Sequence, residues 1–223
     1  MANCLVTGAN RGIGLQVCRQ LAERGDRVIA VCREPSGELE GLNVRIEKGI
    51  DVSDPDDVKR LADSLEGFAI NWLLNNAGVL RSDGLDAIGK DALEGIYDQF
   101  RVNAVGPLLV TRALLDNLAP GARVGIVTSR MGSIADNDSG GYYGYRMSKA
   151  AVNAAGKSLA MDLKDREIAV ALLHPGFVRT DMTGQQGDVE PAEAAAGLIA
   201  RMDELTMENT GSFWHAKGQR LPW

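Results

Sequence analysis

The chain has 223 residues, of which 45% are hydrophobic and 24% charged, and its formal net charge is −6. This length supports one domain with a complete hydrophobic core, residues 1–223, and the acidic balance argues against nucleic-acid binding, which usually needs a basic face. The sequence has no apolar run as long as a membrane span, no signal peptide and no CxxC pair, so we expect a cytoplasmic protein with reduced thiols.

Short apolar runs alternate along the chain with longer segments of helical periodicity. The runs that we predict as strands are Asn3–Gly8, Arg27–Cys32, Val44–Ile50, Asn71–Asn76, Arg123–Ser129, Ile168–Pro175 and Gly211–Ala216. The segments that we predict as helices are Ile13–Gly25, Ser53–Gly67, Ala92–Leu118, Tyr143–Arg166 and Pro191–Leu205. A turn or a brief helix is expected between Arg33 and Asn43.

This alternation predicts an α/β fold of the Rossmann type, a three-layer αβα sandwich with a doubly wound, seven-stranded parallel sheet. Several of the predicted strands are apolar nearly throughout, which is typical of strands that are covered on both faces. Right-handed crossovers would place helices on both sides of the sheet.

A glycine-rich loop, Thr7–Gly14, follows the first predicted strand and opens the first helix. Gly8, Gly12 and Gly14 would permit a tight turn and a close approach of the backbone to a pyrophosphate at the helix N-terminus. An ordinary strand-to-helix turn is the alternative, but the position directly after the first strand favours dinucleotide binding.

The end of the second strand predicts which dinucleotide binds. An acidic residue there would bond the ribose 2′-hydroxyl, whereas this chain has Arg33 and no acid before Glu34. Arg11 lies inside the glycine-rich loop, and two guanidiniums near the ribose would favour a 2′-phosphate. We therefore predict NADP as the cofactor, the alternative being that Arg33 is only a solvated surface charge.

Five short signatures occur in a fixed order along the chain, at Thr7–Gly14, Asn75–Gly78, Asn103, Ser129 and Tyr145–Lys149. In this order they resemble the motifs of the short-chain dehydrogenase/reductase family, and the resemblance runs from the first strand to the last. The stretch Thr128–Asn153 and the ending Gly211–Trp223 are similar, more narrowly, to the C-factor and sniffer-type carbonyl reductase branch.

The resemblance implies how the cofactor is held. Asp51 would accept the adenine amino group with Val52 beside the ring, and the backbone at Val178 and the Thr180 hydroxyl would hold the nicotinamide carboxamide. The implied cofactor-binding residues are Gly8, Asn10, Arg11, Gly12, Ile13, Gly14, Arg33, Asp51, Val52, Asn76, Ala77, Gly78, Tyr145, Lys149, Pro175, Gly176, Val178 and Thr180.

Three tyrosines, Tyr142, Tyr143 and Tyr145, lie around the start of one predicted helix. A helix brings residues i and i+4 onto one face, and only Tyr145 has a lysine, Lys149, at that spacing. Lysine supplies a cation and can exchange a proton, which arginine cannot. We therefore predict Tyr145 as the general acid/base. Lowering its pKa by about three units from about 10 requires about 4 kcal/mol, which Lys149 and the oxidised nicotinamide ring would supply.

The other catalytic roles follow from the resemblance. Ser129 would bond the substrate carbonyl oxygen, and Lys149 would also hold the nicotinamide ribose. Asn103 would distort its helix and hold a water linked to Lys149. Taken alone, a serine at a strand end is usually a cap and a helical lysine a solvated charge. No metal site is expected, because the histidines have no partners at ligand spacing.

Two features depart from the family pattern. From Ser129 to Tyr145 is 145 − 129 = 16 positions, longer than is usual, and the extra residues fall in the turn-rich stretch Ala135–Gly141. The segment Thr183–Pro191 is shorter than the substrate lid of many relatives, which suggests a more open pocket.

The resulting hypothesis is an NADPH-dependent oxidoreductase that reduces a ketone or aldehyde to an alcohol. The alternative is an NADP(H)-binding signalling or sensor protein of the C-factor type with little turnover. A sugar-nucleotide epimerase is a third possibility, but it would need a larger substrate domain. By resemblance, Ala92–Leu118 and Tyr143–Arg166 would form the surface of a homodimer or homotetramer.

Overall fold

The centre of the molecule is a seven-stranded sheet with the order β3-β2-β1-β4-β5-β6-β7, in which every neighbouring pair is parallel. This computed structural model describes the backbone of residues 1–223 and all side chains except that of Asp91. The strands are β1 (Asn3–Thr7), β2 (Arg27–Val31), β3 (Arg45–Glu47), β4 (Ile70–Asn75), β5 (Leu118–Val127), β6 (Ala169–His174) and β7 (Ser212–His215). All seven predicted strands are confirmed.

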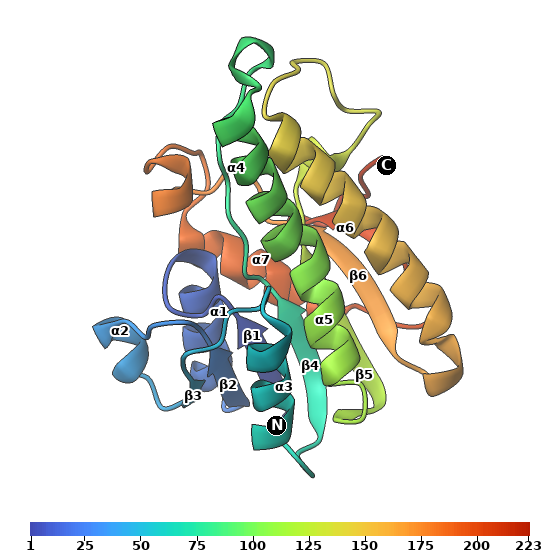
Figure 1. Cartoon of the computed structure of the whole chain (residues 1–223). Helices are drawn as coiled ribbons and strands as arrows, with labels where there is room; N and C mark the ends of the chain where they lie inside the picture. The colour runs from blue at the N-terminus through green and yellow to red at the C-terminus, as the bar shows by residue number, and fades with distance from the viewer.

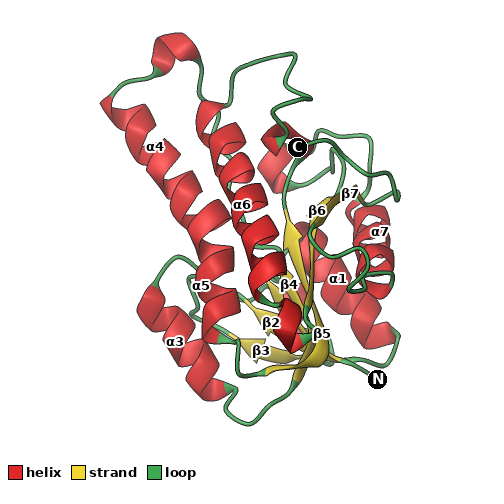
Figure 2. Ribbon diagram, turned by 90° about the vertical axis from the view of Figure 1, so that its right-hand side faces the viewer, coloured by secondary structure: helices red, strands yellow, loops and turns green.

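Helices cover both faces of the sheet, as Figures 1 and 2 show. Figure 2 separates α3, α4, α5 and α6 on one side from α1 and α7 on the other. The helices are α1 (Gly12–Glu23), α2 (Gly37–Glu40), α3 (Pro55–Ser64), α4 (Lys90–Phe100), α5 (Gly106–Ala113), α6 (Tyr143–Asp162) and α7 (Pro191–Asp203). The predicted three-layer α/β architecture is therefore confirmed, and α2 is the brief helix expected after β2.

Two apolar cores lie on opposite faces of the sheet. One packs β1, β4 and β5 against α3, α5 and α6, and includes Leu73, Val110 and Val152. The other packs the sheet against α1 and α7, and includes Leu21 and Leu198. Burial on both faces explains why the strands are almost continuously apolar. In the described part of the chain, no helix has the length and apolar character needed to cross a membrane.

The predicted helix Ala92–Leu118 is wrong in one respect, because the segment is broken. A π-helical turn at Arg101–Val105 separates α4 from α5, and the latter ends at Ala113. In an α-helix the N–H of residue 107 would bond the carbonyl oxygen of Asn103, but Pro107 has no N–H. Leu118 already belongs to β5, where it pairs with Ile70 ahead of a shift in register.

Candidate functional site

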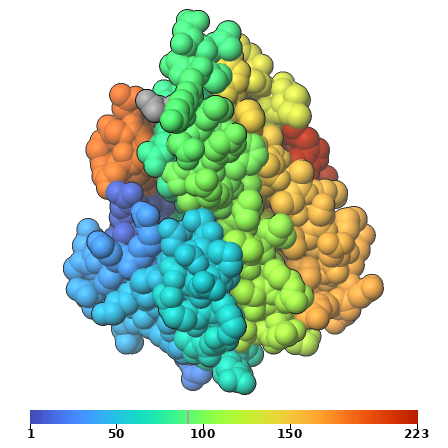
Figure 3. Space-filling model, in the orientation of Figure 1, coloured from blue at the N-terminus to red at the C-terminus, as the bar shows by residue number. Residues whose placement is uncertain are grey.

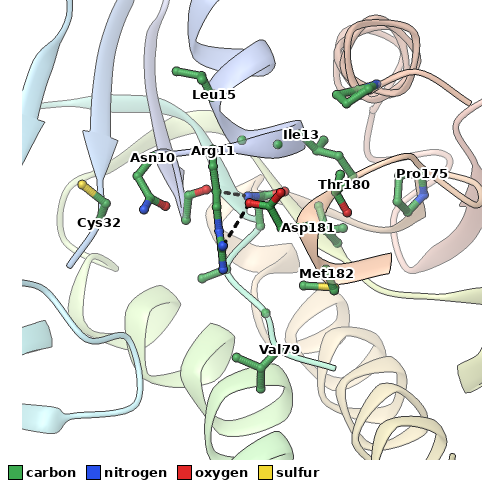
Figure 4. Close-up of a pocket in the computed structure, with 18 of the residues that line it drawn as sticks. Asn10, Arg11, Ile13, Leu15, Cys32, Val79, Pro175, Thr180, Asp181 and Met182 are labelled. Atoms are coloured by element: carbon green, nitrogen blue, oxygen red, sulfur yellow. Dashed lines mark hydrogen bonds and ion pairs between the residues drawn. The ribbon is translucent and has the colours of Figure 1, made fainter. Parts of the chain in front are cut away.

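A cleft of about 520 Å³ opens at the carboxyl ends of the central strands (Figure 4). It runs from the loop after β1 to the α6 residues Tyr145 and Lys149. All residues predicted to bind the cofactor line it except Gly176 and Val178. Val178 is instead buried against Val189 and Ala194. The position at the carboxyl edge of a parallel sheet is where α/β proteins bind nucleotides.

The glycine-rich loop is shaped by close contacts that admit no side chain. Gly8 has φ +66°, and a Cβ there would lie 2.8 Å from the Ala77 Cα. A Cβ on Gly14 would collide with the Gly8 carbonyl oxygen. No side chain caps α1, and its first turn carries no acidic residue. The free N–H groups of this helix end therefore suit the pyrophosphate of a dinucleotide.

The loops after β1 and β4 are bonded to each other at the floor of the cleft. The Thr7 hydroxyl oxygen accepts hydrogen bonds from the N–H groups of Asn76 and Ala77, at 3.0 and 3.1 Å. In return the Asn76 Nδ2 donates to the carbonyl oxygens of Thr7 and Gly8, at 2.9 and 3.2 Å. Asn76 therefore supports the cleft from below, while its neighbour Asn75 is buried and donates to the Thr111 hydroxyl.

The basic residues predicted at the ribose do not both point the same way. Arg33 is exposed and lines the cleft beyond β2. The Arg11 Nη1, however, lies 3.2 Å from the Asp181 Oδ2 across the cleft, as Figure 4 shows. Asp181 follows Arg11 by 170 residues, so sequence reasoning could not find this pair. Asp51 also lines the cleft, and its Oδ1 accepts hydrogen bonds from the backbone and hydroxyl of Ser53.

Tyr145 and Lys149 lie together, as the i+4 spacing predicted. Both are buried in α6, and the Lys149 Nζ is 5.7 Å from the centroid of the Tyr145 ring. The same Nζ donates to the Val127 carbonyl oxygen at 3.0 Å, at the carboxyl end of β5. The other two tyrosines differ from Tyr145, since Tyr142 is exposed and Tyr143 half-buried.

The predicted fall in the pKa of Tyr145 needs the oxidised nicotinamide ring as well as Lys149, and it stays a prediction because the structure shows the chain by itself. Burial raises the pKa of the phenol to about 12, and a hydrogen bond from Ser129 offsets only part of this rise. Burial likewise lowers the pKa of Lys149 to about 8. The site excludes water from both groups, and loss of hydration disfavours the charged form of each. The isolated protein therefore holds Tyr145 as a protonated phenol.

Asn103 lies in the π-helical turn. The expected distortion of its helix is therefore present. Its Oδ1 accepts from the N–H of Val79 at 2.8 Å, and its Nδ2 donates to the Val79 carbonyl oxygen and to the Ser148 hydroxyl. A Cβ on Gly78 would lie 3.2 Å from the Asn103 Oδ1 and 3.7 Å from the Lys149 Nζ. The side chain thus ties the loop after β4 to α6 close to Lys149, although it does not line the cleft.

Ser129 caps a short 3-10 turn, Arg130–Gly132, directly after β5. Its Oγ accepts the N–H of Met131 at 3.1 Å, and its side chain lies near the Tyr145 phenol rather than in the lining of the cleft. The long stretch that follows is turn-rich as expected, with positive φ at Gly140, Gly141 and Tyr142.

Two residues that sequence reasoning missed hold the start of α6. Tyr142, at the N-cap position, provides no side-chain cap. Asp83 substitutes for it, because its Oδ2 accepts the N–H of Gly144 and its carbonyl oxygen accepts the N–H of Tyr142, both at 2.9 Å. Arg146 donates to the carbonyl oxygens of Gly141 and Gly140. The Asp83 contact has no signal in the sequence, because its loop approaches α6 only in the folded chain, and the Arg146 contacts depend on how the chain turns at Gly140 and Gly141.

Comparisons with known proteins agree with this geometry. A family model described as short chain dehydrogenase matches residues 2–191. The chain is 42% identical, over the full length of both proteins, to 1-hydroxy-2-glutathionyl-2-methyl-3-butene dehydrogenase of Rhodococcus sp. (strain AD45). It is 43% identical to the C-signal of Myxococcus xanthus over 69% of this chain and 93% of that protein.

Solved structures give the same result. An NADPH-bound carbonyl reductase from chicken fatty liver superposes with a TM-score of 0.91 at 31% identity, covering 100% of this chain and 99% of that one. The carbonyl reductase Sniffer of D. melanogaster also reaches a TM-score of 0.91, at 29% identity and with both chains fully covered. The motifs, the sheet order and these matches together establish that the chain belongs to the short-chain dehydrogenase/reductase family of oxidoreductases.

Proposed function

We propose that the chain is a single-domain cytoplasmic enzyme that uses NADPH to reduce a ketone or aldehyde to an alcohol. The observation that carries the proposal is the burial of Tyr145 and Lys149 side by side at one end of a dinucleotide-sized cleft. The similarity to an NADPH-bound carbonyl reductase supports the same reaction class.

The residues of the cleft fit a nicotinamide dinucleotide. The uncapped N-terminus of α1 and the glycine contacts at Gly8 and Gly14 suit its pyrophosphate, and Thr180 and Pro175 line the opposite end. When bound, such a cofactor supplies the hydride and, once oxidised, a positive charge. Lys149 would also hold the hydroxyls of the nicotinamide ribose.

Tyr145 acts as the general acid in this proposal. Its raised pKa keeps the proton on the phenol oxygen, from which it passes to the substrate carbonyl oxygen as that oxygen gains electrons. The Ser129 Oγ accepts the Met131 N–H, and its own O–H, which bonds the Tyr145 phenol in the chain by itself, would donate to the same oxygen.

Lys149 and Asn103 restore the proton. After transfer the Lys149 ammonium stabilises the phenolate that remains, and its pKa of about 8 lets it pass a proton on near neutral pH. The carbonyl oxygen of Asn103 lacks the donor that an α-helix would give it, since residue 107 is proline. This carbonyl oxygen would hold a water linked to Lys149.

Two relatives define the alternatives. The C-signal similarity keeps open a signalling or sensor protein that binds NADP(H) with little turnover. The Rhodococcus relative is a dehydrogenase whose name gives it a hydroxyl substrate with a glutathionyl group, so oxidation of an alcohol is a second direction for the same site. The buried Tyr145 beside Lys149 favours an enzyme over a sensor, because cofactor binding alone does not need a proton-donating phenol next to the lysine.

The substitution Tyr145→Phe tests the general acid. It removes the phenol hydroxyl but keeps the ring that packs in the site, so carbonyl turnover should fall by about 100-fold or more while NADPH binding is retained. The measurement is NADPH oxidation with a panel of aldehydes and ketones, beside NADPH affinity by fluorescence. Turnover within a few-fold of wild type would rule out Tyr145 as the acid, and tight NADPH binding by wild type without any turnover would favour the sensor.

The substitution Lys149→Met tests whether function is maintained at the expense of stability. Below pH 8 the native state carries a buried charge that methionine lacks, so the variant should be inactive yet more stable, by about 3 kcal/mol. Between pH 8 and 10.5 Lys149 is protonated in the unfolded chain but neutral in the native state. The free energy of unfolding of wild type therefore rises with pH over this range, and the difference in stability between wild type and variant disappears. Urea unfolding at several pH values measures it, with the exposed-site variant Lys48→Met as control. A pH-independent difference would contradict the account.

NADP is proposed over NAD because of Arg33. This guanidinium lines the cleft at the end of β2, and no carboxylate of a described side chain pairs with it, so it is available to a 2′-phosphate. Arg33→Asp should change the ratio of NADPH to NADH affinity by about tenfold or more toward NADH. Arg27→Asp, at the opposite end of the same strand, is the matched control. An unchanged ratio in Arg33→Asp would remove the basis for NADP.

A homodimer is proposed from the face in Figure 3, where α4 and α5 lie beside α6. The exposed apolar side chains of these helices and of the turn between α4 and α5 are Leu93, Tyr97, Val105, Leu108, Met147 and Met161. Such a patch is typical of a protein–protein contact. Light scattering at micromolar concentration should give a dimer for wild type and a monomer for Leu108→Glu. Met207→Glu, a substitution of an exposed methionine elsewhere, should remain dimeric, and a monomeric wild type would refute the proposal.

A further inference from the structure

We propose that Asn153 is a positioning residue, whose amide holds both ends of the turn that carries Ser129 and so fixes Ser129 against Tyr145. The inference rests on the proposed function, since Ser129 acts there on the substrate carbonyl. Asn153 itself does not line the cleft, although it bonds Thr128, which does, and it belongs to none of the five signatures on which that function is based.

Asn153 lies on the same face of α6 as the proposed catalytic pair. Positions 145, 149 and 153 follow one another at i+4 spacing, so Tyr145, Lys149 and Asn153 form a continuous row. All three are buried, and Asn153 is 4% exposed. The row faces the end of β5 and the turn beyond it, which is where Ser129 lies.

The amide of Asn153 bonds the turn on both sides of Ser129. Its Oδ1 accepts the hydroxyl of Thr128 at 2.8 Å, and Thr128 directly precedes Ser129. Its Nδ2 donates to the carbonyl oxygen of Gly132 at 3.3 Å, and Gly132 is the last residue of the turn. The turn is closed between these points, because the N–H of Gly132 donates to the Ser129 carbonyl oxygen at 2.8 Å.

The turn rests directly on the helix at this point. A Cβ on Gly132 would lie 2.7 to 2.9 Å from the carbonyl carbon, Cβ and carbonyl oxygen of Lys149, so no side chain fits between turn and helix. Packing therefore sets the distance between the two surfaces. It does not set their lateral register, because a bare backbone offers no interlocking side chain. The two amide hydrogen bonds supply most of that register, beside two longer contacts of 3.4 Å, from the Arg146 Nη1 to the Met131 carbonyl oxygen and from the Thr128 hydroxyl to the Lys149 carbonyl oxygen.

The two Asn153 hydrogen bonds, here called the Asn153 clamp, are needed because the chain on one side of the turn is irregular. On one side it continues from β5, but on the other it leads into the long, turn-rich stretch before Tyr142, where three successive residues have positive φ. A side-chain amide accepts through its oxygen and donates through its nitrogen, so Asn153 can bond both sides of the turn with two separate atoms. Thr128 is 2% exposed, so water does not compete for either bond.

A double-mutant cycle tests whether Asn153 acts through Ser129. Asn153→Ala should lower kcat for carbonyl reduction by about tenfold or more, because a displaced hydroxyl no longer meets the substrate oxygen. In a Ser129→Ala background the same substitution should change kcat by less than about twofold, since no hydroxyl remains to be positioned. NADPH affinity should be unchanged throughout. Equal losses in both backgrounds would show a general structural role and overturn the proposal.

Thr128 provides a milder variant in case Asn153→Ala folds poorly. Thr128→Val removes one of the two bonds and should reproduce part of the loss, whereas Thr128→Ser keeps the hydroxyl and should retain activity. Equal activities for Thr128→Val and Thr128→Ser would count against the Asn153 clamp.

Hydrogen exchange gives a readout that does not depend on turnover. The amides of Met131 and Gly132 should exchange faster in Asn153→Ala than in wild type, with the rest of α6 and the sheet unchanged. Unchanged exchange at these amides would overturn the proposal. If wild type reduced no carbonyl at all, the proposed function would fail, while the exchange experiment would still decide whether Asn153 holds the turn.

Discussion

The buried Lys149 ammonium and its hydrogen bond to the Val127 carbonyl oxygen organise this end of the molecule. A cation inside a protein must find an acceptor, and the end of a parallel strand supplies one. Two glycines lie beside it, since a Cβ on Gly132 would collide with the Lys149 backbone and a Cβ on Gly78 would lie 3.2 Å from the Asn103 Oδ1 and 3.7 Å from the Lys149 Nζ. The loop after β4, the turn after β5 and the helix α6 therefore meet at a single residue.

The burial of Tyr145 beside Lys149 acts on the pKa of the phenol in the opposite direction to the charge of the lysine. Lys149 and an oxidised nicotinamide ring were together expected to make the phenol acidic, and in the chain by itself burial dominates and raises the pKa of Tyr145 to about 12. Both groups lose hydration together, so in the protein alone the phenol stays protonated while Lys149 keeps its charge only below about pH 8. In a reduction the proton to be donated is therefore already on the phenol, but the raised pKa makes it a weaker acid until a positive charge stabilises the phenolate. The positive charge that stabilises the phenolate must then come partly from outside the chain.

Sequence patterns predicted what depends on local spacing. The strands, the glycine-rich loop and the Tyr145–Lys149 pair each follow from periodicity or from i+4 geometry, and the structure has them at the expected places. Contacts between distant segments were not predictable, such as Arg11 with Asp181 or Asp83 with the start of α6. The break between α4 and α5 lies between these cases. Pro107 indicates in the sequence that the helix is interrupted. The extent of the π turn could not be predicted, because it depends on the hydrogen bonds between Asn103 and Val79.

The most direct test of the central claim is the ionisation of Tyr145 in the absence of cofactor. Subtracting the ultraviolet titration of Tyr145→Phe from that of wild type isolates this one phenol. The account predicts no additional phenolate at any pH below the free-tyrosine value of about 10. One extra phenolate appearing near neutral pH would contradict it, because the lysine alone would then outweigh burial.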